Sequence, residues 1–177
     1  MNNFAKASAT LLGLFSASAW AAGELQGQLN VQLTVGSGCT ITNGGQTGGT
    51  NTFGTLAFGD YTGLDNIIDG RSLGSGGGSS FGVQCSLGTN YTIAIDNGAN
   101  SAGGQRRMQS GGEFIEYDLY QDSARAVPWG DGGAGGTVLA GTGTGTSEEV
   151  IVYGRVPPQT TPSPGTYLDT VQVTISW

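Results

Sequence analysis

The side chains with the types and spacing for catalysis in this chain are carboxylates. Four of them lie in one short stretch, at Glu113, Glu116, Asp118 and Asp122. In a strand Glu116 and Asp118 share a face, and paired carboxylates can serve as the acid and base of a glycosidase. Bulky Tyr and Leu side chains alternate with these acids, which favours a strand with a solvated acidic face. Because the chain has no histidine, Ser-His-Asp triads and imidazole metal ligands are excluded, and we predict a protein that is not an enzyme.

Two further sets of side chains bear on ligand binding. The aromatic set could stack on sugar rings but more often fills a small sandwich core; it comprises Tyr117, Tyr120 and Trp129. The acidic set fails the spacing of an EF-hand and leaves only a weak calcium site as an alternative; it comprises Asp60, Asp65 and Asp69. The glycine runs lack a phosphate-binding pattern and are interpreted as loop spacers. No cofactor or metal ion is predicted.

The N-terminal residues indicate export. Residues 1–21 combine Lys6, an apolar stretch and the triplet Ala19-Trp20-Ala21, which is typical of a signal peptide cleaved after Ala21. The apolar stretch is too short to span a bilayer, so the mature protein is predicted to be exported and not integral to a membrane. Its five Arg against thirteen Asp and Glu disfavour nucleic acid, which needs a basic surface.

The mature chain has two cysteines, Cys39 and Cys85. In an exported protein one intramolecular disulfide is the simplest interpretation. Two thiols this far apart in sequence do not form a zinc site. A chain of about 155 residues fits a single domain with a true core.

Short segments rich in Val, Ile, Thr, Tyr and Phe alternate with glycine-rich turns, which predicts an all-β sandwich or barrel. The predicted strands are 39–42, 52–58, 79–85, 90–96, 113–122, 148–156 and 166–177. The prolines at 157–164 are expected to form a stiff loop before the last strand.

The first and last extended segments both alternate, the first of them strictly. The stretch LQGQLNVQLTV places apolar residues and one glycine on one face and uncharged polar residues on the other. Its first face comprises Leu25, Gly27, Leu29, Val31, Leu33 and Val35. The last segment places Tyr167, Val171, Val173, Ile175 and Trp177 on one face. If the sandwich is immunoglobulin-like, we expect its final strand to be absent after Trp177.

Several motifs together resemble the spore coat protein U domain family, which includes pilins of archaic, Csu-type chaperone–usher pili. The resemblance covers nearly all of the mature chain, in order. It is carried by FGTLAFGDYTG (53–63), FGVQC (81–85), YTIAIDNG (91–98), RRM (106–108), YDLYQDSARAVPWGDG (117–132) and GTYLDTVQVTISW (165–177).

The resemblance implies an incomplete immunoglobulin-like β-sandwich and a structural pilus subunit. In such pili a periplasmic chaperone lends a strand, and at an outer-membrane usher the N-terminal extension of the next subunit replaces it. By position, the donor strand here is the face that runs from Leu25 to Val35. The acceptor groove is lined by Val171, Val173, Ile175 and Trp177, and Cys39 and Cys85 match the family's disulfide. Adhesion and biofilm formation are the implied roles.

The predicted organisation is therefore a signal peptide (1–21), a donor-strand extension (22–38) and a pilin domain (39–177). The five large aliphatic donor residues would contribute about 1.5 to 3 kcal/mol each on burial, comparable in sum with the stability of a whole domain. One alternative is a secreted coat protein in which residues 25–35 fill the chain's own groove. The other is a carbohydrate-binding sandwich.

Overall fold

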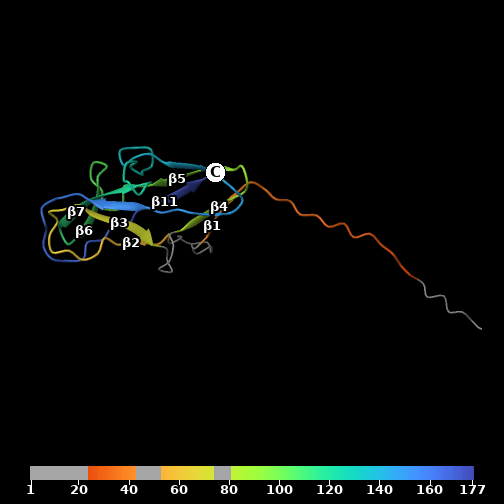
Figure 1. The fold of residues 1–177 in the computed structure, drawn as a ribbon, viewed down its shortest axis with the longest axis horizontal. Coiled ribbons are helices and arrows are strands. Elements are labelled where there is room, and N and C mark those ends of the chain that lie inside the picture. The colour runs from red at the N-terminus through yellow and green to blue at the C-terminus, as the bar shows by residue number, and fades with distance from the viewer. Residues whose placement is uncertain (1–23, 43–52, 74–80) are drawn as a thin grey trace, which may run out of the picture. The chain divides into compact units, whose positions relative to one another are not determined.

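The computed structural model describes residues 24–42, 53–73 and 81–177. The predicted signal peptide lies outside them. Contacts divide the chain into two units, Met1–Thr34 and Val35–Trp177. In the described residues every regular element is a strand (Figure 1), and none is a helix long and apolar enough to cross a membrane. The strands are β1 (Cys39–Thr42), β2 (Thr55–Leu56), β3 (Ile68–Leu73), β4 (Gly82–Cys85), β5 (Asn90–Ile95), β6 (Arg106–Ser110), β7 (Glu113–Tyr120), β8 (Leu139–Thr142), β9 (Ser147–Glu149), β10 (Tyr153–Val156) and β11 (Val173–Ser176).

The strands form three antiparallel sheets. Their orders are β1-β4-β9, β2-β3-β10-β7-β6 and β11-β5-β8. The predicted all-β fold is confirmed, and the sheets are consistent with an immunoglobulin-like sandwich.

Two chain segments pass from one sheet to another and so hold the sandwich together. After β9, Val150 N donates to Phe81 O at 2.8 Å and Val152 O accepts from Ser72 N at 2.8 Å, before β10 joins β3 and β7. The C-terminal segment begins beside β6, where Leu168 exchanges both backbone hydrogen bonds with Gln109, and ends as β11 beside β5. These sheet changes explain why the predicted strands 148–156 and 166–177 are interrupted.

The core lies between the sheets and contains side chains from most strands. Its largest fully buried members are Trp129, Phe81, Ile93, Ile95, Val83, Val156 and Cys85. Apolar side chains of the motif FGTLAF (53–58) pack over a pair of facing glycines, Gly70 of β3 and Gly154 of β10. A side chain on Gly154 would collide with Leu56 and Phe58. The glycines therefore let the residues around β2 pack directly on the sheet.

Most of the predicted strands are present, and three more were not predicted. The segments 39–42, 90–96 and 113–122 correspond to β1, β5 and β7. Of the predicted strands 52–58 and 79–85, residues 52, 79 and 80 lie outside the described residues, and the remaining parts contain β2 (Thr55–Leu56) and β4 (Gly82–Cys85). The strands β3, β6 and β8 were missed. Their sequences, IDGRSL, RRMQS and LAGT, lack the apolar alternation that the prediction required.

Candidate functional site

An open apolar groove with a volume of about 1430 Å³ lies in the Val35–Trp177 unit. One wall is β1 and the other is the C-terminal segment from Tyr167 to Trp177. Between the walls the core residues Phe81, Ile95 and Leu119 reach the groove. The groove therefore reaches down to the hydrophobic core, although these three side chains are themselves buried.

All four predicted acceptor residues, Val171, Val173, Ile175 and Trp177, line this groove. From 167 to 176 the odd-numbered residues are partly buried and the even-numbered ones are exposed, as the predicted alternation requires. Val171, Val173 and Ile175 pack against the core but are not enclosed, and Trp177 remains 64% exposed. The acceptor role of these residues stays a prediction.

The two walls end in strand edges. As far as the described residues show, β1 and β11 each occupy the outer position of their sheet, beside β4 and β5 respectively. On the side away from β5, the outer strand β11 can offer backbone N–H and C=O groups to a further strand. Apolar side chains beside such edges favour the addition of an extended strand over the binding of a small molecule.

One end of the groove is polar, and its geometry depends on Asp169. The carboxylate of Asp169 accepts from the Tyr117 hydroxyl at 2.7 Å and from the Asn100 backbone N–H at 3.2 Å. Burial, followed by the nearby Asp169 carboxylate, raises the pKa of Tyr117 well above its usual range. The tyrosine therefore stays a neutral hydrogen-bond donor and fixes the C-terminal segment to β7.

The stretch from Leu25 to Val35 is exposed and carries no strand. Of its apolar residues, Leu25 is 100% exposed and Val35 is 79% exposed. The other large ones, Leu29, Val31 and Leu33, are exposed to a similar extent. A side chain at Gly27 would have no neighbour within 4 Å. Its alternating pattern is thus present without a sheet partner, and its role as a donor stays a prediction.

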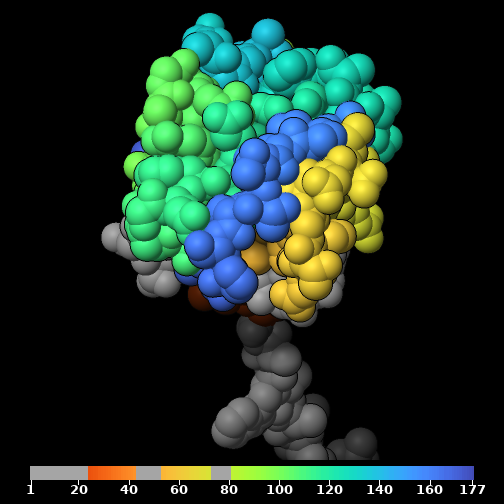
Figure 2. Space-filling view, turned by 90° about the vertical axis from the view of Figure 1, so that its left-hand side faces the viewer, coloured from red at the N-terminus to blue at the C-terminus, as the bar shows by residue number. Residues whose placement is uncertain are grey.

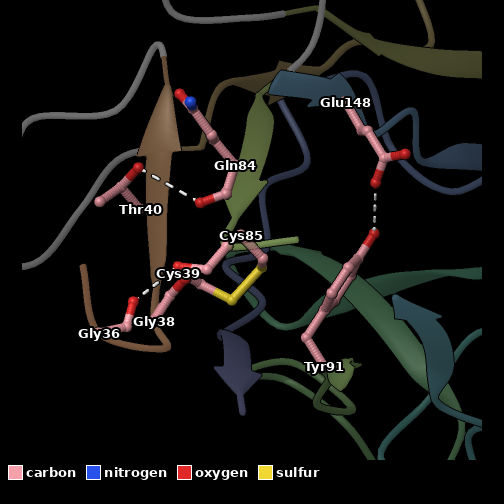
Figure 3. Close-up of a disulfide and its surroundings, with 9 residues drawn as sticks. Gly36, Gly38, Cys39, Thr40, Gln84, Cys85, Tyr91 and Glu148 are labelled. Carbon is pink, nitrogen blue, oxygen red and sulfur yellow. Dashed lines mark hydrogen bonds between the residues drawn. A yellow bond between two sulfur atoms is a disulfide. The ribbon is translucent and has the colours of Figure 1, made fainter. Parts of the chain in front are cut away.

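The disulfide Cys39–Cys85 is present and joins β1 to β4 at the first rung of their ladder. Figure 3 shows this disulfide. Just before Cys39, Ser86 holds the chain through both Gly36 and Gly38. The Ser86 hydroxyl donates to Gly36 O at 2.9 Å, and Ser86 N donates to Gly38 O at 2.9 Å. Cys85 is buried, so the start of the domain is anchored to its core.

Two of the aromatic residues considered as a sugar platform, Tyr117 and Trp129, are buried, whereas Tyr120 is partly buried. Trp129 is fully buried, and its indole N–H donates to Ile93 O at 2.9 Å. Beside it the buried Arg106 guanidinium donates to Ile95 O and Trp129 O, and burial lowers the pKa of this arginine. Because Trp129 has no exposed face, stacking of a sugar on it is ruled out in this fold.

Within the described residues no three His, Cys, Asp or Glu side chains form a group that could hold a metal ion. Glu113 accepts from Ser163 N, and Asp122 accepts from Ala126 N and Val127 N in the turn after β7. These contacts hold loops in place.

In the acidic set at 60–69, the carboxylate of Asp69 is engaged by two arginines. Asp69 lies between Arg125 and Arg155, at 3.2 Å and 2.8 Å from their Nε atoms. A carboxylate engaged with two guanidinium groups is satisfied by cations that the protein itself supplies.

The fold and the groove therefore define the class of protein: an all-β sandwich with an open apolar groove and an exposed alternating segment. The chain belongs to the spore coat protein U domain family, whose model matches residues 25–174. It is 38% identical over 160 residues to Protein U of Myxococcus xanthus, covering 84% of this chain and 83% of that protein. The family resemblance found in the sequence is confirmed.

A solved structure is also similar. It is the pre-assembly complex of the chaperone CsuC with the tip adhesion subunit CsuE, from archaic chaperone–usher Csu pili of Acinetobacter baumannii. The match has 26% sequence identity and a TM-score of 0.49. It covers 81% of this chain and 40% of that chain, so this chain spans less than half of that chain's length.

Proposed function

We propose that this protein is a non-enzymatic structural subunit of an extracellular pilus, which polymerises by donor-strand complementation. In this proposal residues 22–38 are the donor extension, and Leu25, Gly27, Leu29, Val31, Leu33 and Val35 insert into the groove of a neighbouring copy. The observation that carries the proposal is the open groove, whose wall residues Val171, Val173 and Ile175 pack on the core without being enclosed.

The donor and the groove match in length and chemistry. The segments 25–35 and 167–177 each have eleven residues, so one extended strand spans the full wall. The donor offers a branched side chain at nearly every second position, and its other face has no charge. Burial of its five large residues would contribute about 7 to 15 kcal/mol in total, which makes the inserted form much more stable than the open one.

The remaining features of the proposal follow from this mechanism and from the family resemblance. An exposed groove of this kind invites incorrect pairing, so a periplasmic chaperone is expected to cover it until an outer-membrane usher presents the next subunit. The subunit is then exported through the periplasm to the cell surface, where the pilus supports adhesion and biofilm formation. A head-to-tail interface of this type generates an open filament.

The test compares mature chains purified with the chaperone, with and without residues 22–37. The intact chain should form a ladder of oligomers that survives in unheated detergent gels, and the truncated chain should not. Polymerisation of the truncated chain without help would show that the donor assignment is wrong. A heat-resistant monomer of the intact chain, with residues 25–35 protected from proteolysis, would instead support the self-complemented coat protein.

A matched pair of variants tests the alternation. Leu29→Lys with Val31→Lys places two charges on the face that enters the groove and should abolish the ladder, because buried unpaired charges are very costly. Gln28→Lys with Asn30→Lys adds the same charges to the polar face and should preserve the ladder. Trp177 gives an independent signal, since covering its exposed indole should shift its fluorescence to shorter wavelength while Trp129 stays buried.

A further inference from the structure

The residues that join the donor segment to its own domain are held in place by hydrogen bonds and a disulfide. The backbone carbonyls of Gly36 and Gly38 are both held by Ser86, and Cys39 is bonded to Cys85 (Figure 3). The last donor residue, Val35, is thus the direct neighbour of an anchored residue. Consecutive Cα atoms lie 3.8 Å apart, so a groove that accepts Val35 must lie against the surface around Gly36.

That surface presents an exposed leucine on a rigid turn. Leu87 follows Ser86 directly and is 82% exposed. The turn that carries it is fixed on both sides: Gly88 N donates to Gly143 O, and Gly145 N donates to Cys85 O. Leu87 is therefore held in place beside the point where the donor segment joins the domain, although this leucine contributes little to the core of its own domain.

The filament geometry determines which end of the neighbouring groove meets Leu87. The groove runs from Trp177, beside the donor exit at Gly38, to Leu168, beside β6. If two exits met at the Trp177 end, each copy could insert its donor into the other, and the pair would close as a dimer. An open filament requires the other end, where Leu168 lies.

The Leu168 end has the complementary character. Leu168 is 66% exposed although its backbone is fixed to Gln109. On β7, across Gln109 of β6 from Leu168, Phe114 is partly exposed, with the Arg107 guanidinium 4.1 Å from its ring centre. Figure 2 views the domain from this end, where the blue C-terminal part of the chain crosses between the green segment that contains β6 and a yellow segment.

We infer that Leu87 of one subunit packs against Leu168 and Phe114 of the subunit whose groove receives its donor strand. This contact forms a second interface between copies, distinct from the inserted strand, and it rests on the proposed function. Two apolar surfaces that are exposed in the single chain become covered in the filament. The contact limits the bending of one subunit relative to the next.

The inference is tested by crosslinking in assembled filaments of the mature protein. Because the described cysteines are both in the disulfide, a chain with Leu87→Cys and Leu168→Cys has two defined new thiols. A short bismaleimide should join neighbouring subunits and leave a ladder after boiling in reductant. A chain with Leu87→Cys and Val127→Cys is the control, since Val127 is also exposed but lies after β7 and away from Leu168; it should give no ladder.

The outcomes separate this inference from the proposed function. Filaments that form normally but give no ladder with the Leu87 and Leu168 pair, or an equal ladder with the control pair, would overturn the second interface and leave strand exchange intact. The absence of any donor-dependent filament would instead overturn the proposed function and this inference with it. As a second measurement, Leu87→Glu should make filaments more flexible in electron micrographs, whereas Val127→Glu should not.

Discussion

Two regions of the same sandwich are completed to very different degrees. Around Trp129 the apolar surface is enclosed, and the indole N–H and the Arg106 guanidinium all find backbone carbonyls. Along the groove, Val173 and Ile175 pack on one side only, and Trp177 is mostly exposed. The closed region accounts for the fold of the single chain. The open region provides a surface whose stabilisation depends on another strand.

The largest expected effect breaks the closed region. Trp129→Ala removes a fully buried aromatic side chain and its hydrogen bond, and should reduce the free energy of unfolding by about 3 to 5 kcal/mol. Chemical denaturation of the mature chain without its donor segment measures this loss. Trp177→Ala is the matched control and should change the same free energy far less. Equal losses for the two tryptophans would contradict the contrast between the regions.

The disulfide variant should have the next largest effect. Cys39→Ser with Cys85→Ser opens a loop with a sequence separation of 46 residues and should cost about 3 to 4 kcal/mol through the entropy of the unfolded chain. The measurement is again the free energy of unfolding, with dithiothreitol added to the wild type as the control. An unchanged midpoint would show that β1 is already held by its ladder with β4.

A substitution in the groove should affect the stability of the filament more than that of the isolated domain. Ile175→Ala removes a side chain that is only partly buried, so the isolated domain should lose about 1 kcal/mol or less. In the filament the same side chain is covered by the donor strand, and its loss should lower the thermal stability of the oligomer ladder more clearly. Thr174→Ala, on the exposed face of the same strand, is the control. A larger loss in the isolated domain than in the filament would count against the groove as the assembly site.

The two regions also differ in how far the sequence predicts them. The strict alternation of residues 25–35 and the looser one of 166–177 are visible without a structure, and the all-β fold and the disulfide followed from β-branched residues and two cysteines. The strands β3 and β6 were missed because IDGRSL and RRMQS owe their pairing to tertiary contacts. In β3 the ion pairs of Asp69 and the glycine contact at Gly70 replace apolar alternation.

The roles of single side chains could likewise not be predicted from the sequence. The aromatic and acidic sets looked equally suited to binding and to structure, because residue type does not reveal burial. Only the fold shows that Trp129 is enclosed and that Asp169 holds Tyr117 at the end of the groove. Leu87 gave no signal, since an isolated leucine before a glycine is common in turns; its position beside Ser86 depends on the β1–β4 pairing.

The smallest expected effect is the contribution of Asp69, a surface carboxylate away from the groove walls, to the pH dependence of stability. The Arg155 hydrogen bond, followed by the charge of Arg125, keeps the pKa of Asp69 below its ordinary value of 3.8. A carboxyl whose pKa is lower in the folded state stabilises the fold above its unfolded pKa, and this contribution disappears as the pH falls through the folded pKa.

Because Asp69 is 39% exposed, the contribution should be less than about 1 kcal/mol. Asp69→Asn should therefore be slightly less stable than the wild type at pH 6, and the difference should disappear as the pH falls through the lowered pKa of folded Asp69. Asp60→Asn removes the same charge from an exposed loop and serves as the control in thermal melts across this range. A difference that persists unchanged at low pH would show that Asp69 acts through packing and not through its charge.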